Sequence, residues 1–171
     1  MKKQIRTSRY VFLTLTVLTA ALIFYLSSQN GEKSADTSGL LIENLFGNIF
    51  EKLGINLSDI AVFAAIDHIV RKLAHFSEYA ILGFCTAGFL STFDKPKYFT
   101  GIVALTSGFL YACTDEFHQY FVPARSAQFT DVLIDSSGVL TGTAIFIIII
   151  VAAEKIKQKK NTKRQADQSG A

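Results

Sequence analysis

Long apolar runs separated by short polar stretches dominate the chain. Four of them approach the roughly 20 residues that a helix needs to cross about 30 Å of hydrocarbon. They cover residues 10–26, 74–93, 98–114 and 132–153. The first and third are short, and the second carries His75 and Glu78 in its opening turns. We predict an all-α integral membrane protein with four transmembrane helices, of which the last has the strongest pattern.

A more polar segment, residues 27–73, separates the first two predicted spans. Within it, apolar residues recur at helical spacing opposite polar ones, which predicts an amphipathic helix on the membrane surface or over the bundle. The apolar positions are Leu40, Leu41, Leu45, Ile49, Phe50 and Leu53. Gly54 follows as a helix C-cap. Ser58 has the pattern of an N-cap for a second helix, which we expect to continue unbroken over 59–93 because no Pro interrupts it.

Composition agrees with the apolar runs. Half of the 171 residues are hydrophobic and the mean hydropathy is +0.32, which excludes an ordinary soluble domain. We predict one membrane domain, residues 10–153, between a basic start (1–9) and a basic tail (154–171), with 165–171 disordered. Cys85 and Cys113 fall inside predicted spans, and we interpret them as buried thiols rather than a disulfide.

The positive charges predict an orientation. With the N-terminus in the cytoplasm, twelve of the seventeen Lys and Arg residues lie on the cytoplasmic side, as the positive-inside rule requires. We therefore expect a multi-pass membrane protein with both termini cytoplasmic and residues 27–73 outside. A cleaved signal peptide is the alternative for residues 10–26, and its removal would leave the outer face unchanged. The basic tail directly follows a span, so topology and anionic lipid explain it better than nucleic acid.

Ionisable residues accumulate at the outer ends of the predicted spans. The second and third spans are antiparallel and joined by a short turn, so His75 and Glu78 should lie level with Asp115, Glu116 and His118. Such groups are costly near hydrocarbon, which makes a cluster of them a candidate functional site. Other polar residues are expected at the same pocket: Ser27, Ser28, Gln29, Arg71, Lys72, Tyr79, Gln119, Arg125, Asp131 and Asp135. His68 is interpreted as an ordinary interfacial residue. Gly138 and Gly142 follow Asp135 on one stripe and should let a neighbouring helix approach closely.

Three chemistries suit this pocket, and the sequence leaves them open. His75, Glu78, Asp115 and His118 are candidate ligands for a divalent metal. A His beside a carboxylate is also suited to general acid/base catalysis near neutral pH. Finally, Arg71, Lys72 and Arg125 can bind a phosphate or carboxylate at the level of the lipid headgroups. A purely structural role is the alternative, with Lys72 paired to Asp131 or Asp135 and Arg125 to Glu116 as interhelical ion pairs.

The polar motifs resemble, in order, those of the VanZ-like family. The resemblance is carried by residues 24–29 (FYLSSQ), 71–83 (RKLAHFSEYAILG), 115–125 (DEFHQYFVPAR), 131–132 (DV) and Gly138, and it covers about residues 10–152. Three positions depart from the usual pattern: Asn30 after Gln29, Ala124 after Pro123, and Asp135 where Asn is frequent. None removes an ionisable group, and the extra carboxyl of Asp135 has no assigned role.

The resemblance implies a small bacterial membrane protein related to one associated with low-level resistance to the glycopeptide teicoplanin. It implies no reaction. Our leading hypothesis is an enzyme acting on a lipid or a lipid-linked cell-wall precursor, with His75, Glu78, Asp115, Glu116 and His118 as the reactive or metal-binding set. A non-catalytic membrane binder that shields or sequesters the lipoglycopeptide or a precursor is the alternative. A transporter subunit is a third reading, although the chain shows no evident inverted repeat.

Overall fold

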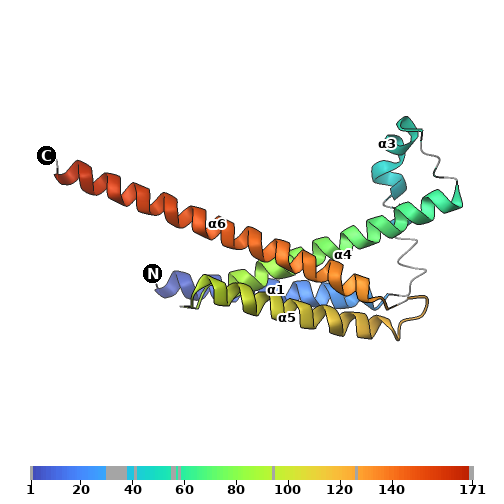
Figure 1. Cartoon of the computed structure of the whole chain (residues 1–171), viewed down its shortest axis with the longest axis horizontal. Coiled ribbons are helices and arrows are strands. Elements are labelled where there is room, and N and C mark those ends of the chain that lie inside the picture. The colour runs from blue at the N-terminus through green and yellow to red at the C-terminus, as the bar shows by residue number, and fades with distance from the viewer. Residues whose placement is uncertain are drawn as a thin grey trace.

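The computed structural model describes residues 2–29, 38–40, 42–54, 57, 59–93, 95–125 and 127–169. Their elements are α1 (Lys2–Ser27), a π-helix η1 (Ile42–Phe46), α3 (Gly47–Lys52), α4 (Ile60–Leu90), α5 (Lys97–Gln119) and α6 (Phe129–Ser169). These residues contain no strand, so the predicted all-α class is confirmed for the part that is described. Figure 1 shows α6 crossing α4, with α1 and α5 alongside and both termini at the same end.

Three of the helices are long and apolar enough to cross a membrane. The candidate segments are Arg6–Ser27, Ile60–Leu90 and Phe129–Thr162, which contain or overlap the first, second and fourth predicted spans. The third predicted span falls within α5, which has 23 residues but carries more polar side chains. The membrane character of the chain therefore rests on three helices, and a fourth crossing stays a prediction.

Helix α4 forms as the sequence predicts, except at its first residue. Asp59 is the N-cap: its carboxylate accepts hydrogen bonds from the backbone N–H groups of Ala61 (2.9 Å) and Val62 (3.4 Å). The predicted cap, Ser58, lies outside the described residues, and the cap assignment was wrong by one position. The helix then continues without interruption to Leu90.

The predicted amphipathic helix is replaced, among the described residues, by the short elements η1 and α3. Leu41 lies outside the described residues. Gly54 has a φ of +72°, the left-handed conformation that glycine adopts most easily, and its N–H donates to the carbonyl of Glu51. The helical stop predicted at Gly54 is therefore confirmed. Ile42 is buried whereas Ile49 and Leu53 are exposed, so the segment does not bury one continuous apolar face.

Glycines let α4 and α6 approach backbone to backbone. A Cβ atom on Gly138 would lie 2.4 Å from the carbonyl oxygen of Phe76, and one on Gly142 would lie 1.8 Å from that of Ala80. On the facing helix, a Cβ on Gly83 would lie 2.4 Å from the carbonyl oxygen of Val139. The close approach predicted for Gly138 and Gly142 is confirmed, and it fixes the start of α6 against the middle of α4.

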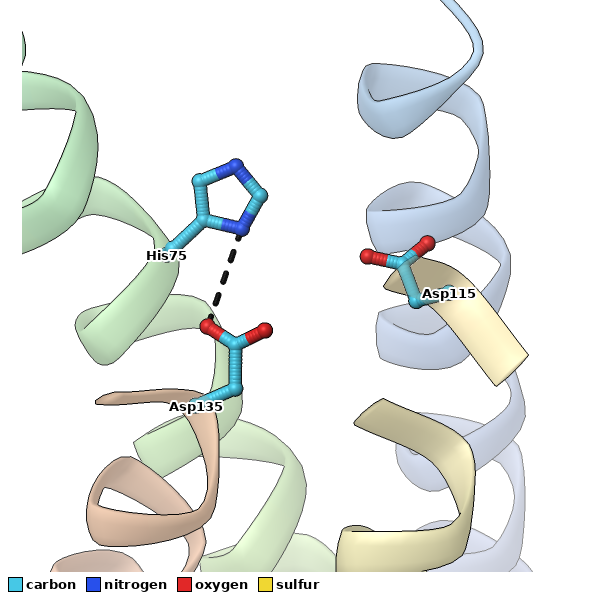
Figure 2. Close-up of side chains that lie close together, drawn as sticks. All are labelled: His75, Asp115 and Asp135. Atoms are coloured by element: carbon cyan, nitrogen blue, oxygen red, sulfur yellow. Dashed lines mark ion pairs between the residues drawn. The ribbon is translucent and has the colours of Figure 1, made fainter. Parts of the chain in front are cut away.

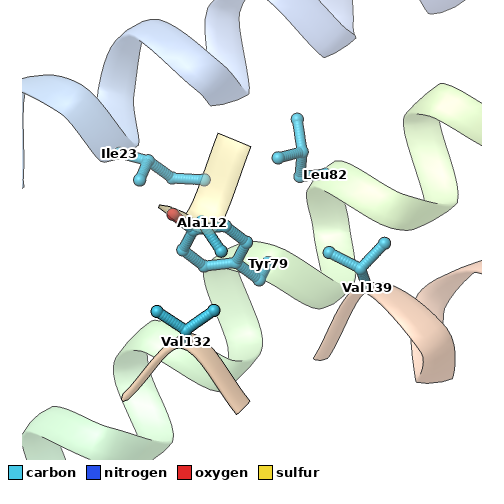
Figure 3. Close-up of a cluster of buried hydrophobic side chains, with 6 residues drawn as sticks. All are labelled: Ile23, Tyr79, Leu82, Ala112, Val132 and Val139. Atoms are coloured by element: carbon cyan, nitrogen blue, oxygen red, sulfur yellow. The ribbon is translucent and has the colours of Figure 1, made fainter. Parts of the chain in front are cut away.

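Two apolar clusters hold the four long helices together. One consists of Ile23, Tyr79, Leu82, Ala112, Val132 and Val139, from all four of these helices (Figure 3). The other is formed by Ala87, Ala104 and Phe146, with Phe12 packed against it. Large apolar side chains on the outer surfaces of the same helices remain exposed, as lipid-facing residues do. The first cluster lies directly beside the polar residues described below.

The C-terminal tail differs from the prediction of disorder from Gln165 onward. Helix α6 continues to Ser169, beyond the last apolar residues. The reason is local: residues 143–169 contain no Gly or Pro, and Lys, Gln, Arg and Ala, which are good helix formers, are frequent among them. Cys85 is buried and Cys113 half-buried, and both are free thiols, as predicted.

Candidate functional site

The polar side chains gather at the end of the bundle where α1 and α5 end and α6 begins. Helix α4 passes this point at His75, the middle of its length. Residues from four separate parts of the sequence therefore meet there, as the antiparallel arrangement predicts. The cluster contains a buried group of three ionisable residues, a set of hydrogen bonds around one of them, and a cavity.

The three ionisable residues are His75 on α4, Asp115 on α5 and Asp135 on α6 (Figure 2). The Nδ1 atom of His75 lies 3.7 Å from Oδ1 of Asp135, and one ligand atom from each of the three residues lies within 4.8 Å of the other two. Asp115 is 3% exposed and Asp135 only 1%. Among the described residues, His75 Nδ1, Asp115 Oδ1 and both oxygens of Asp135 are buried without a hydrogen-bond partner. We call this group the HDD cluster.

Asp115 is held by two side chains, one from the end of α1 and one from its own helix. Its Oδ2 accepts a hydrogen bond from the hydroxyl of Ser27 (2.9 Å) and another from the amide nitrogen of Gln119 (3.0 Å). Gln119 is one turn further along α5, so the amide reaches back along the same face. Both bonds go to the same oxygen, and Oδ1 is left facing the other members of the HDD cluster.

Arg125 fastens the loop after α5 to the end of α1. Its guanidinium donates to the backbone carbonyls of Leu26 (3.1 Å) and Gln29 (3.2 Å), and to the side-chain oxygen of Gln119 (3.2 Å). Ala124, which precedes it, has a φ of 56°. No ion pair is found between Arg125 and Glu116 among the described residues, so the structural alternative that pairs these two side chains is not supported.

A cavity of about 150 Å³ opens beside the HDD cluster. It is bordered by both His75 and Asp135 and by three cationic side chains, Arg71, Lys72 and Arg125. The remaining lining residues are His68, Gln119, Ala124, Gln128, Asp131 and Ile134. The lining of the cavity thus combines three cationic side chains with the carboxylates of Asp131 and Asp135 and the imidazoles of His68 and His75.

Two ion pairs connect the cationic residues to nearby acids. Lys72 Nζ lies 3.0 Å from Oδ1 of Asp131, one of the two partners predicted for it. Arg71 Nε lies 3.2 Å from Oδ2 of Asp67, which also accepts a hydrogen bond from the hydroxyl of Ser38. Both cationic side chains are partly exposed, so these contacts are weak and leave the charges able to attract an anion.

Several predicted site residues lie away from the HDD cluster. His118 stacks on Phe24 with ring centroids 4.7 Å apart, and its Nε2 is 3.2 Å from the hydroxyl of Ser28. Glu116 accepts a hydrogen bond from the backbone N–H of Gln128 (2.5 Å), so it holds the loop before α6.

Two further predicted residues lie in α4. Glu78 is half-buried, and no described residue forms a hydrogen bond or ion pair with it. Tyr79 is fully buried in the apolar cluster of Figure 3, and its hydroxyl faces the carboxylate of Asp115. Gln29 contributes its backbone carbonyl to Arg125. The structure therefore unites His75, Asp115 and Asp135, and does not unite them with Glu78, Glu116 and His118.

Sequence reasoning did not single out Asp67, Ser38 or Gln128, which surround the cavity or hold its rim. Asp67 precedes Arg71 by one helical turn, and that i, i+4 spacing was a usable signal. Ser38 and Gln128 come from segments whose position depends on tertiary packing, so no sequence pattern identifies them. His68 was interpreted as an ordinary interfacial residue, but it lines the cavity.

Comparison with known proteins identifies the family of the chain. The family model VanZ/LLP1 matches residues 12–150, most of the chain, so the protein belongs to the VanZ/LLP1 family. The match covers every member of the HDD cluster and all of the residues around the cavity. No curated protein and no solved structure matches the chain.

Proposed function

We propose that this member of the VanZ/LLP1 family is a membrane enzyme that acts on the anionic headgroup of a lipid or lipid-linked envelope precursor. The observation that supports it is the cavity itself, whose lining contains three cationic side chains, the half-buried imidazole of His75 and the buried carboxylate of Asp135. Buried ionisable groups that border a cavity are the usual components of an active site.

The proposal includes a fourth membrane crossing by α5. Its 23 residues would extend about 35 Å at the usual rise per residue, enough to cross the hydrocarbon. Large apolar side chains such as Ile102 (60% exposed) and Leu110 (57%) lie on its outer surface, as lipid-facing residues would. With this crossing, the basic tail and the turn near Lys95 lie in the cytoplasm, and the cavity opens on the opposite side.

The depth of the cavity suits a headgroup. About 20 residues cross the hydrocarbon, so counting back along α4 from Leu90 reaches Arg71, and counting forward along α5 from Lys97 reaches Glu116. His75 and Asp115 would then lie near the outer boundary of the hydrocarbon. Phosphate or carboxylate groups of a lipid reach this level without leaving the bilayer.

The rim is suited to hold an anion. Arg125 uses its N–H groups on carbonyl and amide oxygens, and no described carboxylate lies within ion-pair distance to neutralise it. Together with Arg71 and Lys72 it would attract phosphate or carboxylate. His75 would transfer a proton to or from the reacting headgroup while Asp135 orients the ring.

Cavity size restricts the substrate. About 150 Å³ is less than the 300–1,000 Å³ of pockets for drug-sized ligands, so the cavity accommodates a headgroup fragment and not a whole lipoglycopeptide. A second cavity of about 340 Å³ lies among Leu82, Phe89, Val103 and neighbouring apolar residues of α1, α4 and α5. Along α4, Tyr79 stands between the two cavities, and the apolar one would accept part of an acyl chain.

The alternative is a non-catalytic binder that shields a precursor or the drug. In that case the cationic rim would bind the same anionic group, and no proton would be transferred.

Full-length protein in lipid nanodiscs is incubated with short-chain anionic phospholipids and lipid-linked precursors, and products are followed by mass spectrometry. We expect turnover that His75→Gln lowers about 10²-fold or more, the usual contribution of a general acid or base. His118→Gln, a histidine at the same end but outside the HDD cluster, is the matched control and should keep most of the activity.

Retention of unchanged ligand at one equivalent per chain would support the binder instead. Equal turnover in wild type and His75→Gln would reject the assigned site. As a cellular readout, the same variants are expressed in a glycopeptide-susceptible bacterium. If the protein acts on the target of a lipoglycopeptide, wild type and His118→Gln should raise the inhibitory concentration of teicoplanin, and His75→Gln should not.

A further inference from the structure

The HDD cluster has a charge problem that its protein neighbours do not solve. Two carboxylates, each at least 97% buried, face an imidazole across a short distance, and no lysine or arginine makes an ion pair with either within the described residues. Both oxygens of Asp135 and Nδ1 of His75 are buried without a hydrogen-bond partner among the described residues, and the hydroxyl of Tyr79 is the neighbour of Asp115 on this side. Buried polar groups left in this way are costly, so their persistence points to a missing partner.

We propose that His75, Asp115 and Asp135 bind one divalent transition-metal cation of the Zn²⁺ or Mn²⁺ type. A cation would partner all three side chains at once and neutralise both carboxylates. Imidazole nitrogen with carboxylate oxygen is a donor set that Zn²⁺ and Mn²⁺ accept, whereas Mg²⁺ prefers oxygen and water alone.

The spacing of the donors fits such an ion after a small adjustment. Metal–ligand distances of roughly 2.1 Å place neighbouring donors of a tetrahedral site about 3.4 Å apart. His75 Nδ1 and Asp135 Oδ1 are 3.7 Å apart, and all three donors lie within 4.8 Å of one another. Binding an ion would therefore draw the three side chains closer together than they lie here.

The neighbours of Asp115 behave as supporting residues of a metal ligand. Ser27 and Gln119 both donate to Oδ2, which fixes the carboxylate and leaves Oδ1 for the ion. Hydrogen bonds of this kind orient ligating carboxylates in metal sites. Since each ligand comes from a different helix, the ion would also tie α4, α5 and α6 together.

Three protein ligands leave a coordination position open, as in catalytic zinc sites. His75 and Asp135 both border the cavity, so this position would be reached from it by water or by an oxygen of the substrate. Binding of the ion does not depend on the proposed function. Its use in a reaction rests on that function, where it would polarise a phosphoryl or carbonyl oxygen, and His75 would then serve as a ligand of the ion and not as the group that transfers the proton.

The test measures the metal directly in full-length protein purified in detergent without chelator. Elemental analysis and calorimetric titration with Zn²⁺, Mn²⁺ and Mg²⁺ should give about one equivalent of transition metal per chain. Asp135→Asn and His75→Gln should each weaken binding about 10-fold to 100-fold or more. Asp67→Asn is the matched control, because it removes a buried carboxylate on α4 outside the cluster and can keep the contacts with Ser38 and Arg71.

Folding is checked independently by thermal unfolding. Added Zn²⁺ should raise the melting temperature of wild type and Asp67→Asn but not of Asp135→Asn. Binding below a tenth of an equivalent in wild type, or unchanged binding in Asp135→Asn, would overturn the proposal. Turnover that depends on His75 without any bound metal would reject the metal site and leave the proposed function standing. Metal bound without any turnover would support the metal site and reject the proposed function.

Discussion

Asp115 owes its position to a hydroxyl and an amide that arrive from two directions. Ser27, the last residue of α1, is fully buried and donates to Oδ2 at 2.9 Å, and Gln119 donates to the same oxygen from the next turn of α5. A buried carboxylate with fixed donors on one oxygen presents the other in a defined direction. The end of α1 is therefore part of the site although none of its residues belongs to the HDD cluster.

Replacing Ser27 with Ala should destabilise the protein by about 1–3 kcal/mol, because one donor to a buried carboxylate is lost. Ser77→Ala is the control, since that exposed hydroxyl donates only to the carbonyl of Leu73 in its own helix. Thermal unfolding in detergent compares the two. Equal melting temperatures for both variants would show that the bond from Ser27 contributes nothing to stability.

The contrast between Asp115 and His118 shows how far the sequence determines the site. Helical spacing predicts that Asp115, His118 and Gln119 lie near one face, and all three do face the bundle interior or its edge. Residues three apart are nevertheless turned about 60° from one another, in the direction opposite to residues four apart. That difference directs His118 to the ring of Phe24 while Gln119 remains beside Asp115. Packing between the helices decides which side of α5 contacts α1. The residue pattern of one helix alone does not give this information.

At the scale of the elements, the contact between α4 and α6 determines where the ligands meet. The two glycines of α6 bring its backbone onto Phe76 and Ala80, which flank Tyr79 on α4. Asp135 lies three residues before Gly138, so the same contact brings its carboxylate to His75. Sequence spacing predicted this approach correctly, because small residues four apart have one dominant use in membrane helices.

Gly142→Ala should therefore be strongly destabilising. Its Cβ would lie 1.8 Å from the carbonyl oxygen of Ala80, so the helices must separate, and overpacking of this kind costs about 1–3 kcal/mol or more. Gly101→Ala on α5 is the control, since its nearest neighbour would be Ile147 Cδ1 at 3.6 Å, an ordinary contact. The control should be neutral or slightly stabilising, because Ala favours helix. A melting temperature for Gly142→Ala at or above that of Gly101→Ala would contradict the packing described for α4 and α6.

Other elements were less predictable for physical reasons. The start of α4 was placed one residue early because Ser and Asp are equally good caps, and only the backbone conformation of Asp59 decides between them. The outer segment forms η1 and α3 instead of one amphipathic helix. The apolar period alone could not show this, because short helices depend on what they pack against.

At the scale of the whole molecule, the lengths of the helices and the distribution of charge together predict how the protein would lie in the membrane. Helix α4 has 31 residues and extends about 47 Å, well beyond the roughly 30 Å of hydrocarbon. Its first turns, with η1 and α3 nearby in Figure 1, would project from the outer surface. At the other end, α6 leaves the bundle as a basic helix, which in the proposed orientation would lie at the cytoplasmic surface beside anionic lipid. In that orientation the polar cavity would lie between the two, at the outer boundary.

This arrangement depends on α5 crossing the bilayer, which cysteine labelling can test. In a background with Cys85→Ala and Cys113→Ala, single cysteines are placed at exposed residues: Lys95→Cys before α5, and Ala127→Cys and Asn48→Cys on the proposed outer side. An impermeant maleimide should label Ala127→Cys and Asn48→Cys in intact cells. Lys95→Cys should react only after permeabilisation, because the twelve cytoplasmic Lys and Arg residues place its turn inside.

Each failed outcome points to a different error. If Lys95→Cys and Ala127→Cys react from the same side, α5 does not cross, and the membrane domain has three spans with the tail outside. If they react from opposite sides but Ala127→Cys is cytoplasmic, the fold stands and the orientation is inverted. The cavity would then face the inner leaflet. An envelope precursor exposed only outside the cell could not reach His75 in that case. The substrate would have to be a lipid of the cytoplasmic leaflet.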